Sequence, residues 1–167
     1  MPEFTIGPLG NWEGTAKVII KTGNIAEEKV DAICISVGST LEHSSSTWKA
    51  ITKICGTKVY KDAYEKARKA QTTWLNRGEI LVVDTRDTKL DAKYVFLVVL
   101  PDIYHLETAY TNIFREAIAH RCTSVAIPGL GCEANVKGMC SGDESDQPGG
   151  SFEAVAKTPA TVSCDVL

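Results

Sequence analysis

The chain has 167 residues, of which 44% are hydrophobic and 23% are charged. This length and composition predict a single domain with a sizeable core, and no apolar run reaches the ~20 residues that span a bilayer. Because 18 Lys and Arg stand against 21 Asp and Glu, the formal net charge is -3, which gives no global attraction to nucleic acid or acidic membranes. The net charge does not exclude local basic patches.

Cysteine usage and the amino terminus bear on the compartment. The six cysteines form no C-x-x-C pair, and Cys34 and Cys122 lie in or beside apolar runs. This favours an intracellular protein, cytoplasmic or nuclear, with buried thiols over a disulfide framework or a zinc site. No secretory signal pattern is present. Residues 1–14 are expected to be a leader or disordered, because GPLG at residues 7–10 resembles a protease-cleavage scar.

The first half of the chain predicts two strands and two helices. The strands are expected at residues 16–20 and 32–36, which are short β-branched or apolar runs. Hydroxyl residues 44–47 offer caps for a helix that ends near Gly56. Residues 59–75 show apolar side chains at near-helical spacing. The cations of this second helix indicate a solvated basic face, with contact to a polyanion as the alternative; they are Lys58, Lys61, Lys66, Arg68 and Lys69.

The second half continues the alternation. Strands are expected at residues 80–84, 94–100 and 124–127, and the unbroken run YVFLVVL at 94–100 suits a strand covered on both faces. Apolar residues between Leu106 and Ile118 recur with the period of a helix packed on the sheet. Alternating strands and helices predict an α/β sandwich at residues 15–138. Residues 139–167 are expected to be flexible or atypical, with a weak strand in TVSCDVL.

Four segments, in this order, resemble the macrodomain family, an α/β/α module that generally binds ADP-ribose and related groups. Gly23-Asn24-Ile25 stands where the family usually has Gly-Asp-Ile, and Val30-Asp31-Ala32-Ile33 matches Val-Asp-Ala-Ile. LDAKYVFLVVLP at 90–101 and SVAIPGLG at 124–131 resemble two further family strands. The resemblance implies a three-layer α/β/α macrodomain-like fold with a central mixed sheet and a shortened or atypical carboxyl end. The chain is similar to the macrodomains that are found beside ADP-ribosyltransferase domains.

The resemblance also implies which residues contact the ligand. Adenine is expected near Gly23, Asn24 and Ile25, where a neutral Asn24 replaces the family's Asp and weakens recognition; a turn residue is the other interpretation of Asn24. The phosphates are expected between two loops, which contribute Gly38, Ser44, Ser45, Ser46 and Thr47, and Gly129, Leu130, Gly131, Cys132 and Glu133. The serines replace family glycines and would otherwise be a plain helix cap. Glu133 places a carboxylate where it opposes a diphosphate.

Catalysis is not expected. Hydrolytic macrodomains use an Asn in the first loop and an acidic residue after the glycine run, and these positions fall on Gly38 and Trp48, which cannot orient or deprotonate water. His43 and Cys132 are interpreted as an exposed loop residue and a structural thiol. No catalytic residue, metal site or cofactor is therefore predicted.

The leading functional hypothesis is weak, non-catalytic recognition of ADP-ribose, an ADP-ribosylated protein or a related nucleotide diphosphate, through a divergent pocket. The alternative is an interaction module that has lost ADP-ribose binding and contacts protein or nucleic acid. An ADP-ribosyl hydrolase is the least favoured hypothesis, and no membrane partner is expected.

Overall fold

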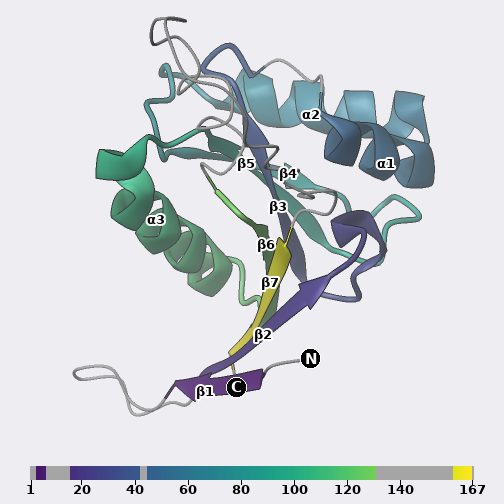
Figure 1. Ribbon diagram of the computed structural model, residues 1–167. Helices are drawn as coiled ribbons and strands as arrows, with labels where there is room; N and C mark the ends of the chain where they lie inside the picture. The colour runs from purple at the N-terminus through teal and green to yellow at the C-terminus, as the bar shows by residue number, and fades with distance from the viewer. Residues whose placement is uncertain (1–2, 7–15, 42–44, 131–159, 167) are drawn as a thin grey trace, which may run out of the picture.

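The computed structural model describes residues 3–6, 16–41, 45–130 and 160–166. These residues form one sheet flanked by helices (Figure 1). In chain order the elements are β1 (Glu3–Ile6), β2 (Ala16–Thr22), the 3-10 helix η1 (Ile25–Glu27), β3 (Ala32–Val37), α1 (Ser46–Cys55), α2 (Thr57–Ala70), β4 (Ile80–Asp84), β5 (Tyr94–Val99), the 3-10 helix η2 (Ile103–His105), α3 (Leu106–Ala119), β6 (Ser124–Pro128) and β7 (Ala160–Val166).

The sheet is mixed, as expected from the sequence. Its strand order is β1-β2-β7-β6-β3-β5-β4. Strand β3 runs parallel to both of its neighbours, β5 and β6. The remaining neighbours are antiparallel. The three adjacent strands β6, β3 and β5 are therefore parallel to one another, and β4 forms the edge next to β5.

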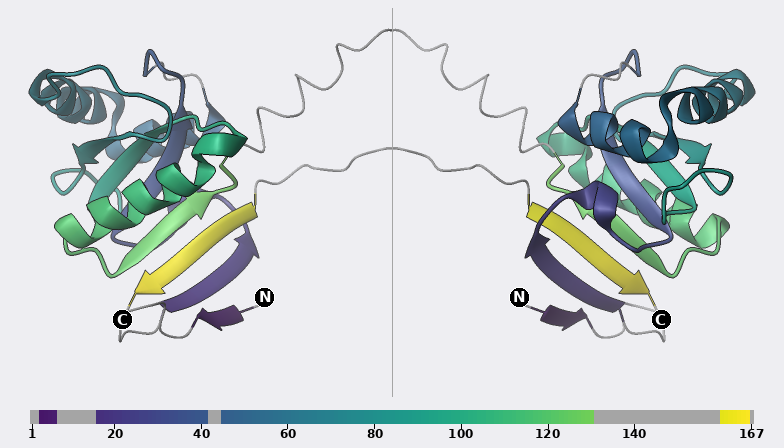
Figure 2. Two further views of the ribbon diagram at one scale, coloured as in Figure 1. Left: turned by 90° about the vertical axis from the view of Figure 1, so that its left-hand side faces the viewer. Right: turned by 90° about the vertical axis from the view of Figure 1, so that its right-hand side faces the viewer.

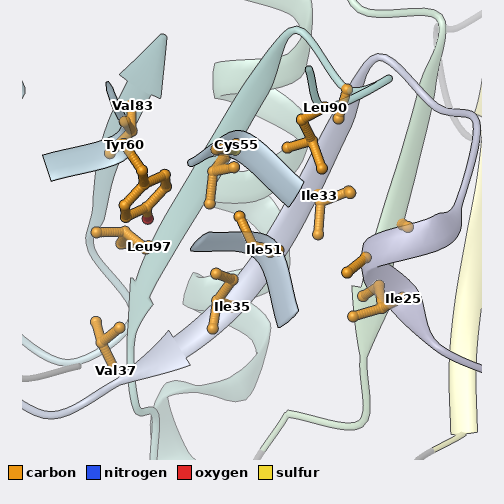
Figure 3. Close-up of a cluster of buried hydrophobic side chains, with 14 of the residues drawn as sticks. Ile25, Ile33, Ile35, Val37, Ile51, Cys55, Tyr60, Val83, Leu90 and Leu97 are labelled. Carbon is orange, nitrogen blue, oxygen red and sulfur yellow. The ribbon is translucent and has the colours of Figure 1, made fainter. Parts of the chain in front are cut away.

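Helices cover both faces of this sheet, which confirms the three-layer α/β/α architecture. Figure 2 shows α1 and α2 on one side and α3 on the other. Alternate side chains of β3 enter the two layers, because successive residues of a strand point to opposite faces. Ile33, Ile35 and Val37 belong to the cluster that contains Ile51 and Cys55 of α1 (Figure 3). Ala32 and Cys34 join the cluster beneath α3.

Two of the predicted elements owe their positions to simple apolar patterns. The run expected as a strand covered on both faces is β5, whose residues after Tyr94 are all buried. The expected third helix is α3, which buries Ala109, Ile113 and Ala117 at intervals of four residues. These residues lie on one stripe of the helix and pack against Phe96 and Val98.

The second helix differs from the prediction at both of its ends. A single residue, Gly56, separates α1 from α2, and its φ of 87° is a left-handed conformation that glycine adopts without steric cost. The helix therefore begins at Thr57, before the expected Val59. It ends at Ala70, where the N–H of Gln71 bonds to the Ala67 and Arg68 carbonyls. Lys58, Lys61 and Lys69 are exposed.

Two strands come from segments outside the expected domain limits of 15 and 138. Strand β1 pairs with β2, and β7 lies between β2 and β6 in the segment where a weak strand is expected from the sequence. The limits themselves stay a prediction. Among the described residues, Cys34, Cys55 and Cys122 are buried, and no helix is both long and apolar enough to cross a bilayer.

Candidate functional site

The predicted ligand loops follow two neighbouring parallel strands. Gly38 comes directly after β3, and Gly129 directly after β6, so both lie at the same edge of the sheet. Backbone pairing between these strands is limited to Ala32 with Val125 and Ile33 with Ala126, although both strands continue beyond it. By contrast, β3 pairs with β5 along its whole length.

The chain leaves β3 and β5 in opposite directions. After β3 it passes to α1 on one face of the sheet, and after β5 it passes to α3 on the other face. Open α/β sheets bind ligands at such a point, because the diverging loops leave a crevice outside the carboxyl ends of the strands. The topology therefore places the candidate site beside Gly38 and the end of β5.

The loop after β3 has space at Gly38 and an unusual backbone at Leu41. Among the described atoms, a Cβ atom at Gly38 would meet only the Thr40 Oγ1, at 3.9 Å. The N–H of Leu41 donates to the Gly38 carbonyl at 2.8 Å. Leu41 has a φ of 59° and is 3% exposed. A non-glycine residue in this region costs roughly 1–2 kcal/mol, so burial of the Leu41 side chain stabilises the turn. The sequence carried no signal for this residue.

Ser45 caps helix α1. Its extended backbone and its Oγ, which accepts from the Trp48 N–H at 3.1 Å, are the features of an N-cap. Ser46 and Thr47 occupy the first turn, where backbone N–H groups lack partners within the helix. Such a helix start favours anions. Ser44 and His43 lie outside the described residues.

Asn24 has a structural role at the start of η1. Its Oδ1 accepts from the Ala26 N–H at 3.2 Å, and its Nδ2 donates to the Glu27 Oε1 at 2.9 Å. The side chain is exposed, whereas Ile25 and Ala26 are buried beneath it. Asn24 thus fills the turn role, and one lone pair of Oδ1 stays available to a ligand.

The structure describes only some of the remaining predicted residues. Gly129 is half-buried, and Leu130 is buried in the cluster beneath α3. Gly131, Cys132 and Glu133 lie outside the described residues. Trp48, at the position of the family's acidic residue, packs edge-on against Tyr60 with ring centroids 6.4 Å apart.

A polar cluster at the end of β5 was not identified from the sequence. Asp102 caps η2 by accepting from the Tyr104 and His105 N–H groups, and it also contacts the His105 Nδ1 at 2.5 Å and an Arg77 guanidinium nitrogen at 2.8 Å. The His105 hydrogen bond lowers the pKa of Asp102. Ile103 and Tyr104 are 77% and 88% exposed. The sequence feature that could have indicated this cap is Asp102 directly after Pro101, where the predicted strand ends.

The Asp of the Val-Asp-Ala-Ile segment lies at the opposite end of the sheet. The carboxylate of Asp31 accepts from the Thr123 N–H at 2.7 Å and the Thr123 hydroxyl at 2.8 Å, and it pairs with Lys93 Nζ at 2.7 Å. Burial acts to raise the pKa of this carboxyl, but the bonds from Lys93 and Thr123 outweigh it and lower the pKa from 3.8 to about 2. Asp31 therefore holds strands together and lies away from the candidate site.

Comparisons with known proteins agree with this architecture. The family model described as Macro domain matches residues 36–137, more than half of the chain. Among curated proteins, none matches the sequence. The chain covers 52% of the macro domain of ganglioside induced differentiation associated protein 2, so it spans about half of that structure.

Three further solved structures resemble the fold. The Oceanobacillus iheyensis macrodomain with ADP is 15% identical with a TM-score of 0.53, over 68% of this chain and 70% of that one. A mutant of the same macrodomain is 17% identical with a TM-score of 0.59, over 79% and 71%. The macrodomain of Mycobacterium tuberculosis DarG is 18% identical with a TM-score of 0.53, over 67% and 75%. The chain belongs to the Macro domain family.

Proposed function

We propose that the protein recognises ADP-ribose, free or attached to a protein, or a related nucleotide diphosphate, without hydrolysing it. The observation that carries the proposal is the position of Gly38 and Gly129 after two neighbouring parallel strands, beside the point where the chain leaves β3 and β5 in opposite directions. Family membership supports the ligand class, because macrodomains generally bind ADP-ribose. A structurally similar macrodomain was solved with ADP.

The diphosphate would lie between the loop after β6 and the first turn of α1. Backbone N–H groups of a glycine-containing loop and of a helix start attract anions. Ser44 to Thr47 and Gly129 to Glu133 are the proposed phosphate contacts, and Gly23 to Ile25 are the proposed adenine contacts. Glu133 would weaken the affinity through its negative charge.

Restoring the family pattern should strengthen binding. The triple variant Asn24→Asp, Glu27→Gln and Gly38→Asn is expected to bind ADP-ribose about tenfold more tightly than the wild type. A charged adenine contact returns at position 24, and position 38 regains the Asn whose amide contacts the distal ribose in the family. Glu27 is included because a carboxylate at position 24 would otherwise face the Glu27 carboxylate across the present 2.9 Å contact. A Cβ atom at Gly38 would meet no described atom closer than 3.9 Å. Titration calorimetry measures the affinity.

The single variant Glu27→Gln serves as the control, since it removes a nearby charge without restoring a contact; it should bind like the wild type. Ser45 is kept because it caps α1. If neither the wild type nor the triple variant gives heat with millimolar ADP-ribose, the binding proposal fails. The interaction-module hypothesis would then take its place.

Hydrolysis should be absent. Gly38 and Trp48 offer no group that orients or deprotonates water, so a mono-ADP-ribosylated substrate should stay intact under conditions in which an active macrodomain releases its ADP-ribose. Chromatographic detection of free ADP-ribose tests this directly. Release by the wild type that disappears in His43→Ala would contradict the expectation and identify a base in the first loop.

A further inference from the structure

A groove separate from the nucleotide site lies between α2 and the edge strand β4. Its cavity volume is about 430 Å³. The apolar side chains of α2 that line it are Val59, Ala63, Ala67 and Ala70. On β4, Val82 also lines the groove, although its side chain packs against the cluster beneath α3. The four helical residues recur at intervals of three or four, so they form one stripe along the helix. Three of them are alanines, whose short side chains leave the groove open.

Among the described strands, the strand beside this groove, β4, pairs on one side only, with β5. In the antiparallel ladder of β4 and β5, the Thr85 N–H donates to the Lys93 carbonyl, and the Val99 N–H donates to the Glu79 carbonyl, each at 2.9 Å. Residues of an antiparallel edge strand alternate between facing the partner and facing outward. Backbone groups of residues 80, 82 and 84 therefore face outward, and Val82 and Asp84 line the groove.

The charges of the groove are unbalanced toward the acidic side. Asp62, Asp84 and Asp87 line it together with one cation, Lys66. Asp84 pairs with Arg86 at 2.5 Å. Within the described part of the chain, Asp62 and Asp87 form no ion pair. A ligand with a positive charge at this end would gain two carboxylate partners.

We propose that the groove binds an extended segment of another protein as an additional strand on β4. Main-chain hydrogen bonds to residues 80–84 would supply affinity, and the helix beside the strand would select side chains. Small apolar side chains would rest against the alanines of α2. A Lys or Arg of the segment would pair with Asp62 and Asp87.

The test uses the full chain and a library of short random peptides displayed on phage. Peptides selected on the wild type should alternate in apolar residues and carry Lys or Arg. In the variant Val82→Pro the outward N–H is removed while the bonds between β4 and β5 are kept, so a selected peptide should bind about tenfold more weakly. Backbone amide shifts and exchange rates should change at Val82 and Asp84.

A second variant tests the groove independently, in case Val82→Pro does not fold. Ala67→Arg fills the groove and repels a cation from a half-buried helix position, and it should also weaken binding about tenfold. Glu65→Arg makes a similar change at an exposed position outside the groove and should bind like the wild type. The proposal is overturned if no selected peptide distinguishes the wild type from these two groove variants, or if the selected peptides are acidic. A dimer that Val82→Pro dissociates would assign the edge to a second copy and also overturn it.

Discussion

Replacing Gly78 by alanine should destabilise the protein by about 3 kcal/mol. Gly78 has a φ of 80°, which disfavours any side chain, and an added Cβ would lie 3.2 Å from the Ala109 nitrogen and 3.3 Å from the His105 oxygen. Both contacts are backbone atoms of the α3 region and cannot rotate away. The Gly78 N–H also donates to the Val99 carbonyl at 2.8 Å, so the change would disturb the end of β5.

Thermal unfolding should show this loss as a fall in Tm of about 6 to 12 °C. Gly38→Ala is the matched control, because among the described atoms its Cβ would meet a single side-chain atom at 3.9 Å, and its backbone lies outside the left-handed region. It should change stability by less than about 0.5 kcal/mol. Equal Tm values for the wild type and Gly78→Ala would contradict the prediction, because they would show that the backbone of α3 shifts to accommodate the added Cβ.

Asp31→Asn should cost about 3 kcal/mol at neutral pH, because the amide loses the ion pair and must turn its NH2 group either toward the Lys93 ammonium or toward the two Thr123 donors. Asp31 joins the amino ends of three strands through its backbone as well: its carbonyl accepts from Lys93 and Tyr94, and its N–H donates to the Ser124 hydroxyl at 3.0 Å. Urea unfolding measures the difference. The exposed residue Asp91, changed to Asn, is the control and should have little effect.

This cost should depend on pH in a defined direction. Because folding lowers the pKa of Asp31 from 3.8 to about 2, its charge stabilises the native state fully above pH 3.8, and this contribution disappears as the pH falls through about 2. The change corresponds to about 2 kcal/mol. The wild type should lose this amount on acidification, while Asp31→Asn should not. A stability difference that stays constant down to pH 2 would contradict the assignment.

The sequence alone determined the class of the fold and much of its secondary structure. The unbroken apolar run of β5 and the four-residue spacing in α3 are local patterns, and burial on both faces or on one stripe follows from them. Four short segments in order were enough to indicate the family. Ser45 likewise indicated the start of α1, because a cap depends on atoms only three residues apart.

Only the tertiary structure decided features that join distant residues. Asp31 and Thr123 are 92 positions apart, and no local pattern predicts that the Asp of a family motif ties strands together. The steric need for Gly78 depends on the backbone of α3, and the groove at β4 exists because a helix with small side chains packs beside an unpaired edge. Such features arise from packing between elements, and for that reason residue spacing and composition did not reveal them.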